Sequence, residues 1–548
     1  MDSVGIEEFL AEEEEEGYLA EQLYSNNPQP TSFVLAHGLS ILQLLATSAA
    51  TTSEPNEFVS ANHFLKLTTR LALLEGCFSP QRRLPPEMLG LIFTFCLDDD
   101  LTTEYTLSEE EHMLIVLGQV CSRWRAVVRI MIGFWTKLHF RTAAMKPCNA
   151  AVTQHLISLS RDMPLSLRFS SLIFDGDEEY IQRSNDSDGQ ASAMDLPSLS
   201  ALECVVDRLE QLELDVTATD FRCSLVNRSD MEFCMLSTLS ISVVDSRKCD
   251  FEDCLEIFRN APVLRTLTIV GDEPPSVGED GWPHMDTVWC SSFPWNQLTN
   301  LTIDIGIIAA EARKILCLCT ALEVAVFSKL ADDPAEEDAR FGRVLYPDST
   351  LPNLRELSIT SDRMFCCDVL ECMWLPNLES LTLEMFNCLD ANPILRDLAQ
   401  RSNFSLLRLR LCGLDGFDRT ADVLHSFLTH ISTLQELDLQ YCSDLVGLMK
   451  SFTYPRSQGG LALLRFPHLR VFTVTQPDLG PDGECPKSFL RLVESLSHHA
   501  GGGGETPCPV LETIRIPFHA DGGTRMKEQL ASVCANGFNI EYLSSDPE

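Results

Sequence analysis

The sequence predicts an α/β fold: a small all-helical module, followed by a solenoid with a curved parallel sheet inside and helices outside. Two observations predict this architecture. Residues 81–142 are dense in apolar residues at helical spacing, and a Leu-x-x-Leu-x-Leu pattern recurs from about residue 200 almost to the end of the chain. At 548 residues the chain is too long for one simple core, so we expect two or more domains.

The composition restricts the class of protein. The chain has 80 acidic and 41 basic residues, a net charge of −39. We therefore expect no nucleic-acid partner, because phosphate binding needs a basic face. A solvated acidic surface is the simplest interpretation of the charge, and attraction of basic partners is the alternative. The 21 cysteines include no Cys-x-x-Cys pair. We expect buried, reduced thiols rather than a metal site.

The N-terminal residues 1–56 are acidic and predict a mostly disordered tail. The apolar stretch Phe33–Ala50 is too short and too polar to predict a membrane span. Residues 57–80 follow with apolar residues at spacings of three and four, which predicts an amphipathic helix. The acidic N-terminus carries no secretory signal, so we expect a cytoplasmic or nuclear protein.

The helical module begins at Leu84-Pro85-Pro86-Glu87. Prolines suit the first turn of a helix, and a glutamate there lies near the positive end of the helix dipole. An apolar stripe follows at Leu89, Ile92, Phe93, Cys96 and Leu97. Ser108 and Glu111 form a capping box for a second apolar stretch, which Gly118 is expected to divide into two helices. Short helices this apolar either pack on the rest of the chain or await a partner.

The order of these residues resembles the F-box family. Leu-Pro-x-Glu opens the first helix, Val120-Cys121-Ser122-Arg123-Trp124-Arg125 follows, and Phe134-Trp135 closes the module. The resemblance implies binding to a Skp-type linker and entry into an SCF-type cullin–RING ubiquitin ligase. The linker-binding residues that it implies are Leu84, Pro85, Glu87, Ile92, Phe93, Leu97, Val120, Cys121, Trp124 and Trp135. Met88 departs from the family's usual Ile or Leu. The acidic insert Asp98–Glu111 resembles the fungal branch of the family.

A connecting segment, residues 143–198, precedes the repeats. Leu165, Leu167 and Phe169 alternate as in a strand, and Asp175–Pro197 is acidic and Ser-rich, which predicts a flexible loop. From 199 to 548 the repeat pattern dominates. Its copies begin at Leu209, Leu236, Leu264, Leu298, Leu354, Leu378, Leu406, Leu434, Leu469 and Leu511, with a degenerate copy at Leu322.

From Leu236 to Leu434 the starts lie 24 to 34 residues apart, a period typical of leucine-rich repeats. Helices are expected between copies at Phe251–Arg259, Glu311–Leu318, Pro393–Gln400, Thr420–Thr429 and Pro486–Leu496. The usual Asn after each strand is missing in nearly every copy, which resembles the irregular repeats of F-box adaptors. A set of unrelated buried strands is the alternative interpretation.

Alternate residues of a strand face opposite sides, so the residues between the template leucines should line the concave face. The candidate substrate residues on that face are Asn300, Thr302, Asp304, Glu356, Glu384, Arg408, Arg410, Glu436, Asp438 and Gln440. A plain solvated surface with cross-strand ion pairs is the alternative. The insertions Gly271–Ser292, Asp332–Asp348 and His498–Pro507 are further candidates for binding, the first because it holds Trp282 and Trp289.

The sequence contains no Gly-x-Ser-x-Gly, Walker, His-Glu-x-x-His or Rossmann motif. We therefore expect no catalytic, cofactor or metal residues and no enzyme activity. The leading interpretation is a substrate-recognition adaptor for ubiquitin-dependent degradation. Its partners would be a Skp-type linker, a cullin scaffold and a protein substrate, for which the acidic surface favours a basic chain. No membrane partner is expected. The alternative is a non-ligase interaction scaffold built on the repeats.

Overall fold

A computed structural model describes most of both predicted regions. The described residues are 84–96, 103–106, 113–143, 150–172, 199–217, 231–244, 255–271, 291–331, 349–361, 369–371, 373–385, 391–413, 427–428, 430–440, 468–475, 491, 512–517 and 539–543. The chain divides into two compact units, residues 1–174 and 175–548. Several predicted features lie outside the described residues: the tail 1–56, the helix 57–80, Leu97, the Ser108/Glu111 capping box, the loop Asp175–Pro197, the insertions Asp332–Asp348 and His498–Pro507, and most of Gly271–Ser292.

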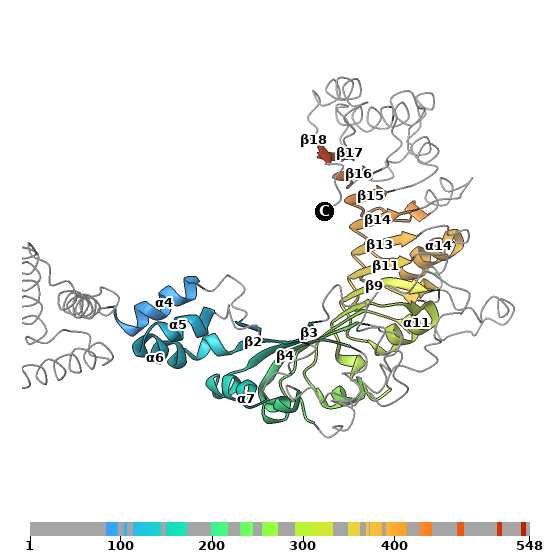
Figure 1. The fold of residues 1–548 in the computed structure, drawn as a ribbon. Coiled ribbons are helices and arrows are strands. Elements are labelled where there is room, and N and C mark those ends of the chain that lie inside the picture. The colour runs from blue at the N-terminus through green and yellow to red at the C-terminus, as the bar shows by residue number, and fades with distance from the viewer. Residues whose placement is uncertain are drawn as a thin grey trace, which may run out of the picture. The chain divides into compact units, whose positions relative to one another are not determined.

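The first unit joins a helical module to a short parallel sheet (Figure 1). Its helices are α4 (Pro86–Cys96), α5 (Met113–Val120), α6 (Ser122–Ile130), the 3-10 turn η2 (Ile132–Trp135) and α7 (Ala150–Leu159). Its strands are β1 (Thr103–Thr106), β2 (Lys137–Ala143) and β3 (Leu165–Leu172), and β2 pairs with both others. Sequence reasoning found β3 but missed β1, β2 and α7. The alternation of buried Leu138 and Phe140 was the signal for β2.

The predicted division of the second apolar stretch into two helices is confirmed, but its position at Gly118 was wrong. Gly118 is buried within α5, and its carbonyl accepts a hydrogen bond from Nε of Arg125 at 2.9 Å. The break falls at Cys121, whose backbone is extended and whose Sγ accepts the N–H of Trp124 at 3.4 Å. A side chain that caps α6 therefore sets the boundary, because glycine inside a packed helix costs only about 1 kcal/mol.

The second unit is an α/β solenoid of the leucine-rich-repeat type, as the periodicity predicts. Twelve strands follow one another in parallel: β4 (Leu209–Thr217), β5 (Thr238–Val244), β6 (Thr266–Gly271), β7 (Asn300–Asp304), β9 (Val324–Ala331), β11 (Glu356–Ser361), β13 (Ser380–Met385), β14 (Arg408–Cys412), β15 (Glu436–Gln440), β16 (Val471–Thr475), β17 (Thr513–Pro517) and β18 (Asn539–Leu543). Short strands complete the pattern: β8 (Ile307–Ile308) pairs with β9, and β10 (Ser349–Thr350) with β12 (Met373–Trp374).

The register of these strands stacks the template residues into two apolar columns. The first column runs through Leu212, Leu239, Leu267, Leu301, Ala325, Leu357, Leu381, Leu409, Leu437, Phe472, Ile514 and Ile540. From Leu212 to Ile514 its side chains are at most 2% exposed. The degenerate copy fits because small Ala325 in this column is followed by large Phe327 in the next, both fully buried. Stacking the repeats thus forms one continuous core.

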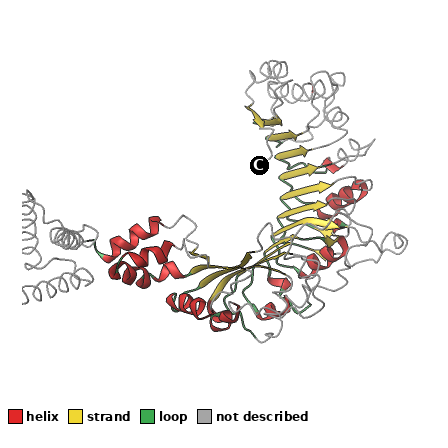
Figure 2. Ribbon diagram, in the orientation of Figure 1, coloured by secondary structure: helices red, strands yellow, loops and turns green. Residues whose placement is uncertain are grey.

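In the second unit, helices lie on one side of the strands (Figure 2). Helix α11 (Ala309–Leu318) and helix α14 (Ala391–Ser402) confirm two of the predicted helices. Of Phe251–Arg259 the structure describes residues 255–259, which are helical and continue into the 3-10 turn η6 (Ile257–Asn260). Only residues 427–428 and 491 are described in the last two, and they are helical. Further 3-10 turns are η3 (Leu199–Cys204), η4 (Val206–Arg208) and η7 (Trp295–Gln297).

Polar side chains before the strands link each repeat to the previous one. The Nδ2 of Asn377 donates to the carbonyl of Pro352 at 2.6 Å, and the Oγ1 of Thr433 donates to that of Leu406 at 2.8 Å. The Nε2 of Gln297 donates in the same way to the carbonyl of Ala261, at 2.5 Å. These bonds give the turn carbonyls a side-chain partner from the following repeat.

Candidate protein-interaction surfaces

Helix α4 is apolar on two sides, and only one of them is covered by described residues. Leu89 and Phe93 are buried, and the ring of Phe93 lies 4.9 Å from that of Trp124. The second stripe consists of Met88, Leu91, Ile92 and Phe95, at spacings of three, one and three. All four are exposed, and Phe95 reaches 81%. Because residues at these spacings share one helix face, they form a continuous apolar stripe.

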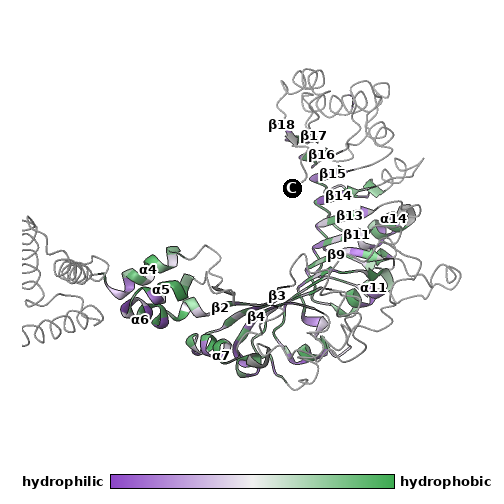
Figure 3. Ribbon diagram, viewed as in Figure 1, coloured by the Kyte–Doolittle hydropathy of each residue, from purple (hydrophilic) through white to green (hydrophobic). Residues whose placement is uncertain are grey.

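Helix α5 repeats this arrangement. Leu114 and Leu117 are buried, whereas Met113, Val116 and Val120 are exposed at spacings of three and four. With Ile130 of α6, the module holds eight of the thirteen exposed large apolar side chains among the described residues. Figure 3 shows hydrophobic colouring along both helices. A concentration of this kind is typical of an interaction site, whereas apolar residues scattered singly over a surface are ordinary.

The residues that the F-box resemblance implies divide into a surface set and a core set. Pro85, Glu87, Ile92 and Val120 are exposed, and Leu84 is half-buried, with its carbonyl accepting a hydrogen bond from Nη2 of Arg123.

Phe93 and Trp135 belong to the core, where Nε1 of Trp135 donates to the carbonyl of Val128 at 2.9 Å. Cys121 and Trp124 are half-buried at the start of α6. Sequence reasoning missed Met88, Leu91, Phe95, Met113 and Val116 as surface residues. Their own spacing of three and four was the available signal.

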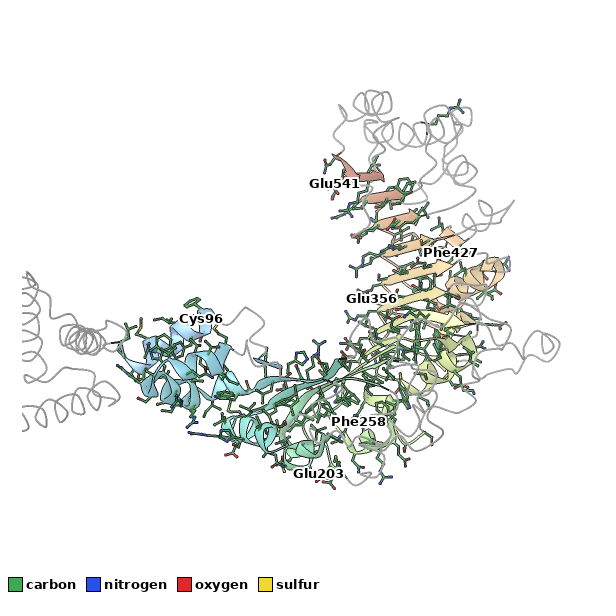
Figure 4. The ribbon with its side chains drawn as sticks, in the orientation of Figure 1. Cys96, Glu203, Phe258, Glu356, Phe427 and Glu541 are labelled. Carbon is green, nitrogen blue, oxygen red and sulfur yellow. The ribbon has the colours of Figure 1, made fainter. Side chains whose placement is uncertain are left out.

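The second unit exposes the strand residues that alternate with the apolar columns; we call this surface the open face. In Figure 4, Glu356 and Glu541 lie on one side of the strands and Phe427 on the other. From β5 to β13 the open face carries mostly hydroxyl side chains, among them Thr268, Thr302 and Thr382. Charged residues are more frequent from β14 to β18, and Asp304, Glu356 and Glu384 lie earlier, on β7, β11 and β13. Along these strands open-face residues alternate with buried ones, as in β11.

The charged part of the open face centres on Asp438. Its Oδ2 accepts a hydrogen bond from Nε2 of Gln440 at 2.9 Å and lies 3.7 Å from Nε of Arg410. The same arginine donates from Nη2 to Oε1 of Gln440 at 3.2 Å. The second oxygen of Asp438, Oδ1, is buried and has no hydrogen-bond partner among the described residues. Burial raises the pKa of Asp438, while the bond from Gln440 and the charges of Arg410 and Arg515 oppose that rise.

Two cross-strand contacts flank this centre. On one side, Glu384 accepts bonds from Oγ1 of Thr360 at 3.4 Å and from Sγ of Cys412 at 3.7 Å. Burial, with the nearby charge of Glu384, raises the pKa of Cys412 to about 12. On the other side, Nε of Arg515 lies 2.7 Å from Oε2 of Glu541, and this bond raises the pKa of Arg515.

The predicted cross-strand ion pairs are present only in part. Arg408 and Glu436 are register partners on β14 and β15, yet both are exposed and neither forms an ion pair within the described residues. Glu356 on β11 is likewise exposed and unpaired among them. On β7, Asp304 pairs with Lys329 at 3.3 Å, while Asn300 is exposed and Thr302 half-buried.

In the described part of the chain, no group of three or more His, Cys, Asp or Glu residues is arranged to hold a metal ion. No helix there is long and apolar enough to cross a membrane.

The similarity of this chain to known proteins is remote. A solved structure similar to this chain is the leucine-rich repeat-containing protein LegL7 from Legionella pneumophila, with 12% sequence identity and a TM-score of 0.31. The similarity covers 58% of this chain and 87% of that chain. No protein-family model and no curated protein matches the chain. The repeat assignment therefore depends on the chain's own in-register strands and buried leucine columns.

Proposed function

We propose that this protein is a substrate-recognition adaptor of an SCF-type cullin–RING ubiquitin ligase. The helical module binds a Skp-type linker, the linker connects to a cullin, and the repeat unit binds a protein substrate. The observation that carries the proposal is the pair of exposed apolar stripes on α4 and α5. They lie in the segment whose residue order, from Leu84-Pro85 to Trp135, resembles the F-box.

The stripes suit a permanent protein partner better than water. Burying one Leu, Ile, Met or Phe side chain contributes about 1.5–3 kcal/mol, so a partner that covers several of them gains substantial affinity. Phe95 is the natural anchor, because large aromatic residues dominate the binding energy of many interfaces. The adaptor itself carries no active site in this proposal. It accelerates ubiquitin transfer by holding a substrate lysine near the loaded carrier, which raises the effective concentration.

The test is capture of a purified Skp-type linker and cullin by the full chain. Leu91→Asp places a charge in the α4 stripe, and Met163→Asp is its matched control, because the two side chains are 49% and 48% exposed. We expect the wild type and Met163→Asp to capture both proteins. Leu91→Asp, and the double change of Leu84 and Pro85 to Ala, should capture neither. Circular dichroism checks that each variant is folded.

Two results would overturn the proposal. One is a wild-type chain that captures no linker, and the other is a folded Leu91→Asp variant that captures it as well as wild type. If the linker and cullin bind but no partner of the repeat unit changes its half-life when Pro85 is replaced, the protein is a non-ligase scaffold. In this second candidate function the repeat surface still binds a partner, but the binding does not lead to degradation of that partner.

A further inference from the structure

We propose that the open face from β11 to β18 binds an extended basic segment of the substrate. The inference rests on the proposed function, in which the repeat unit binds the substrate, and it names the chemistry of that substrate. The partner is a Lys- or Arg-containing stretch that lies across the strands. Charge balance, spacing and one unsatisfied buried acceptor each support it.

The charge balance of this face is negative once its internal pairs are removed. Arg410 pairs with Asp438, and Arg515 pairs with Glu541. The charges that remain are the acids Glu356, Glu384 and Glu436 and the single base Arg408. Glu356 and Glu436 are exposed and form no ion pair within the described residues. Unpaired surface carboxylates on a chain of net charge −39 favour a cationic partner and speed its approach.

The spacing of Glu356 and Glu436, which form no ion pair among the described residues, fits an extended chain. Glu356 on β11 and Glu436 on β15 occupy the same position of the register, linked through Ser380 and Arg408 on the strands between them. Three strand steps of about 4.8 Å separate them by roughly 14 Å. An extended segment rises about 3.4 Å per residue, so side chains four residues apart span nearly the same distance and point to the same side. Basic residues at positions i and i+4 would reach both carboxylates.

Asp438 adds a directional contact at the Glu436 end. Its Oδ1 is a buried acceptor without a partner among the described residues, and leaving such a group unsatisfied is unfavourable. The neighbouring strand β16 presents Val471 and Thr473 beside Glu436 and Asp438, so short side chains border the two acids on that side, whereas β14 places Arg408 and Arg410 on the other. The aliphatic stem of a Lys or Arg can lie on Val471 while its charged end donates toward Glu436 and Asp438.

The test uses the full chain and fluorescent twelve-residue peptides. One peptide carries Lys at positions i and i+4 in a Gly/Ser background, and its partner carries Glu at both. Fluorescence anisotropy at low and physiological salt gives each Kd. We expect binding of the Lys peptide that weakens with salt, and at least tenfold weaker binding of the Glu peptide.

Charge reversals then locate the contact. Glu356→Lys with Glu436→Lys should weaken binding of the Lys peptide at least tenfold. The control, Glu232→Lys with Asp397→Lys, changes the net charge equally but lies outside the open face, with Asp397 on helix α14. It should change Kd less than threefold. Arg408→Glu should tighten binding several-fold, because it removes a cation that forms no ion pair among the described residues of this surface.

The inference is overturned if the folded wild type binds the Lys peptide no better than the Glu peptide. It is also overturned if the control pair weakens binding as much as the open-face pair, which would leave only long-range attraction. Linker capture by the same preparation is measured separately. Linker capture without peptide binding overturns this inference alone, whereas peptide binding without linker capture overturns the adaptor proposal and retains the basic-segment site.

Discussion

Asp438 faces Arg410 with only one of its two oxygens. Oδ2 lies 3.7 Å from Nε of the arginine, whereas Oδ1 is buried and has no hydrogen-bond partner among the described residues. The loss of hydration at this carboxyl therefore outweighs the help of its neighbours, and its pKa is raised. Ionisation of Asp438 thus opposes folding, even though the group lies beside a cation.

The Asp438→Asn variant should gain stability relative to the wild type as the pH rises from 4 to 7. A carboxyl whose pKa is higher in the folded state holds its proton longer there, so its contribution to stability falls as pH rises through that pKa. Asparagine does not ionise, so the variant avoids this loss of stability. Urea unfolding of both proteins at pH 4 and pH 7 gives the comparison, with Glu436→Gln as the control for removing a carboxylate from the same strand. If the wild type instead gained stability relative to the variant as the pH rose, that result would contradict the raised pKa of Asp438.

Cys412 and Cys319 should resist alkylation in the native protein. Burial raises the pKa of both thiols to about 12, with Glu384 also acting on Cys412 and Cys317 on Cys319. Only the thiolate reacts, and at pH 8 a pKa near 12 leaves about a thousandth of the thiolate of an ordinary cysteine. Mass spectrometry after brief iodoacetamide treatment measures each peptide. The exposed Cys204 and Cys234 are the internal controls, and urea should remove the difference.

Phe93 and Phe95 should give opposite results in stability and binding, although they lie two residues apart on α4. Phe93 is fully buried, so Phe93→Ala should lower the free energy of unfolding by about 3–5 kcal/mol. Phe95 is 81% exposed, so Phe95→Ala should change it by less than about 0.5 kcal/mol. Phe95→Ala should instead weaken linker binding by about 2 kcal/mol, the loss typical of an anchor residue. A strongly destabilising Phe95→Ala would place that ring in the core.

Leu381→Ala should destabilise the centre of the repeat unit by about 2–5 kcal/mol, because it opens a cavity in the first apolar column. Hydrogen exchange should report the damage first in β11 and β14, whose Leu357 and Leu409 are its register neighbours. Thr382→Ala on the adjoining open-face position is the matched control and should have little effect. Equal effects of the two changes would contradict the described direction of the strand.

The repeat strands could be predicted because their register follows directly from leucine spacing. Every copy of the pattern forms a strand, including the degenerate one at Ala325 and Phe327. Strand β18 was missed because Gly537 stands where the template expects leucine, although Ile540 pairs with Ile514 as the pattern requires. Strand β2 was missed because its first residues were assigned to the end of the helical module. The repeat template therefore predicted strands only where its first residue was apolar.

The surfaces were harder to predict than the strands. Helix α4 is apolar on both sides, so spacing alone does not tell whether Phe93 or Phe95 faces the core. On the open face, alternation identified the charged residues but not their partners. Arg408 and Arg410 each have an acid directly beside them on β15, yet only Arg410 forms the ion pair. That choice depends on side-chain rotamers and on the bond from Gln440, which the sequence does not encode locally.

Because each main strand of the second unit bonds only to its neighbours along the chain, the unit should respond to stretching in steps. A force applied at its two ends would break the hydrogen bonds between one pair of neighbouring strands after another. It would not load many strand pairs at once. Each opened repeat of about 28 residues would release roughly 100 Å of chain. The unit would therefore lengthen at modest force and refold one repeat at a time when the force is released.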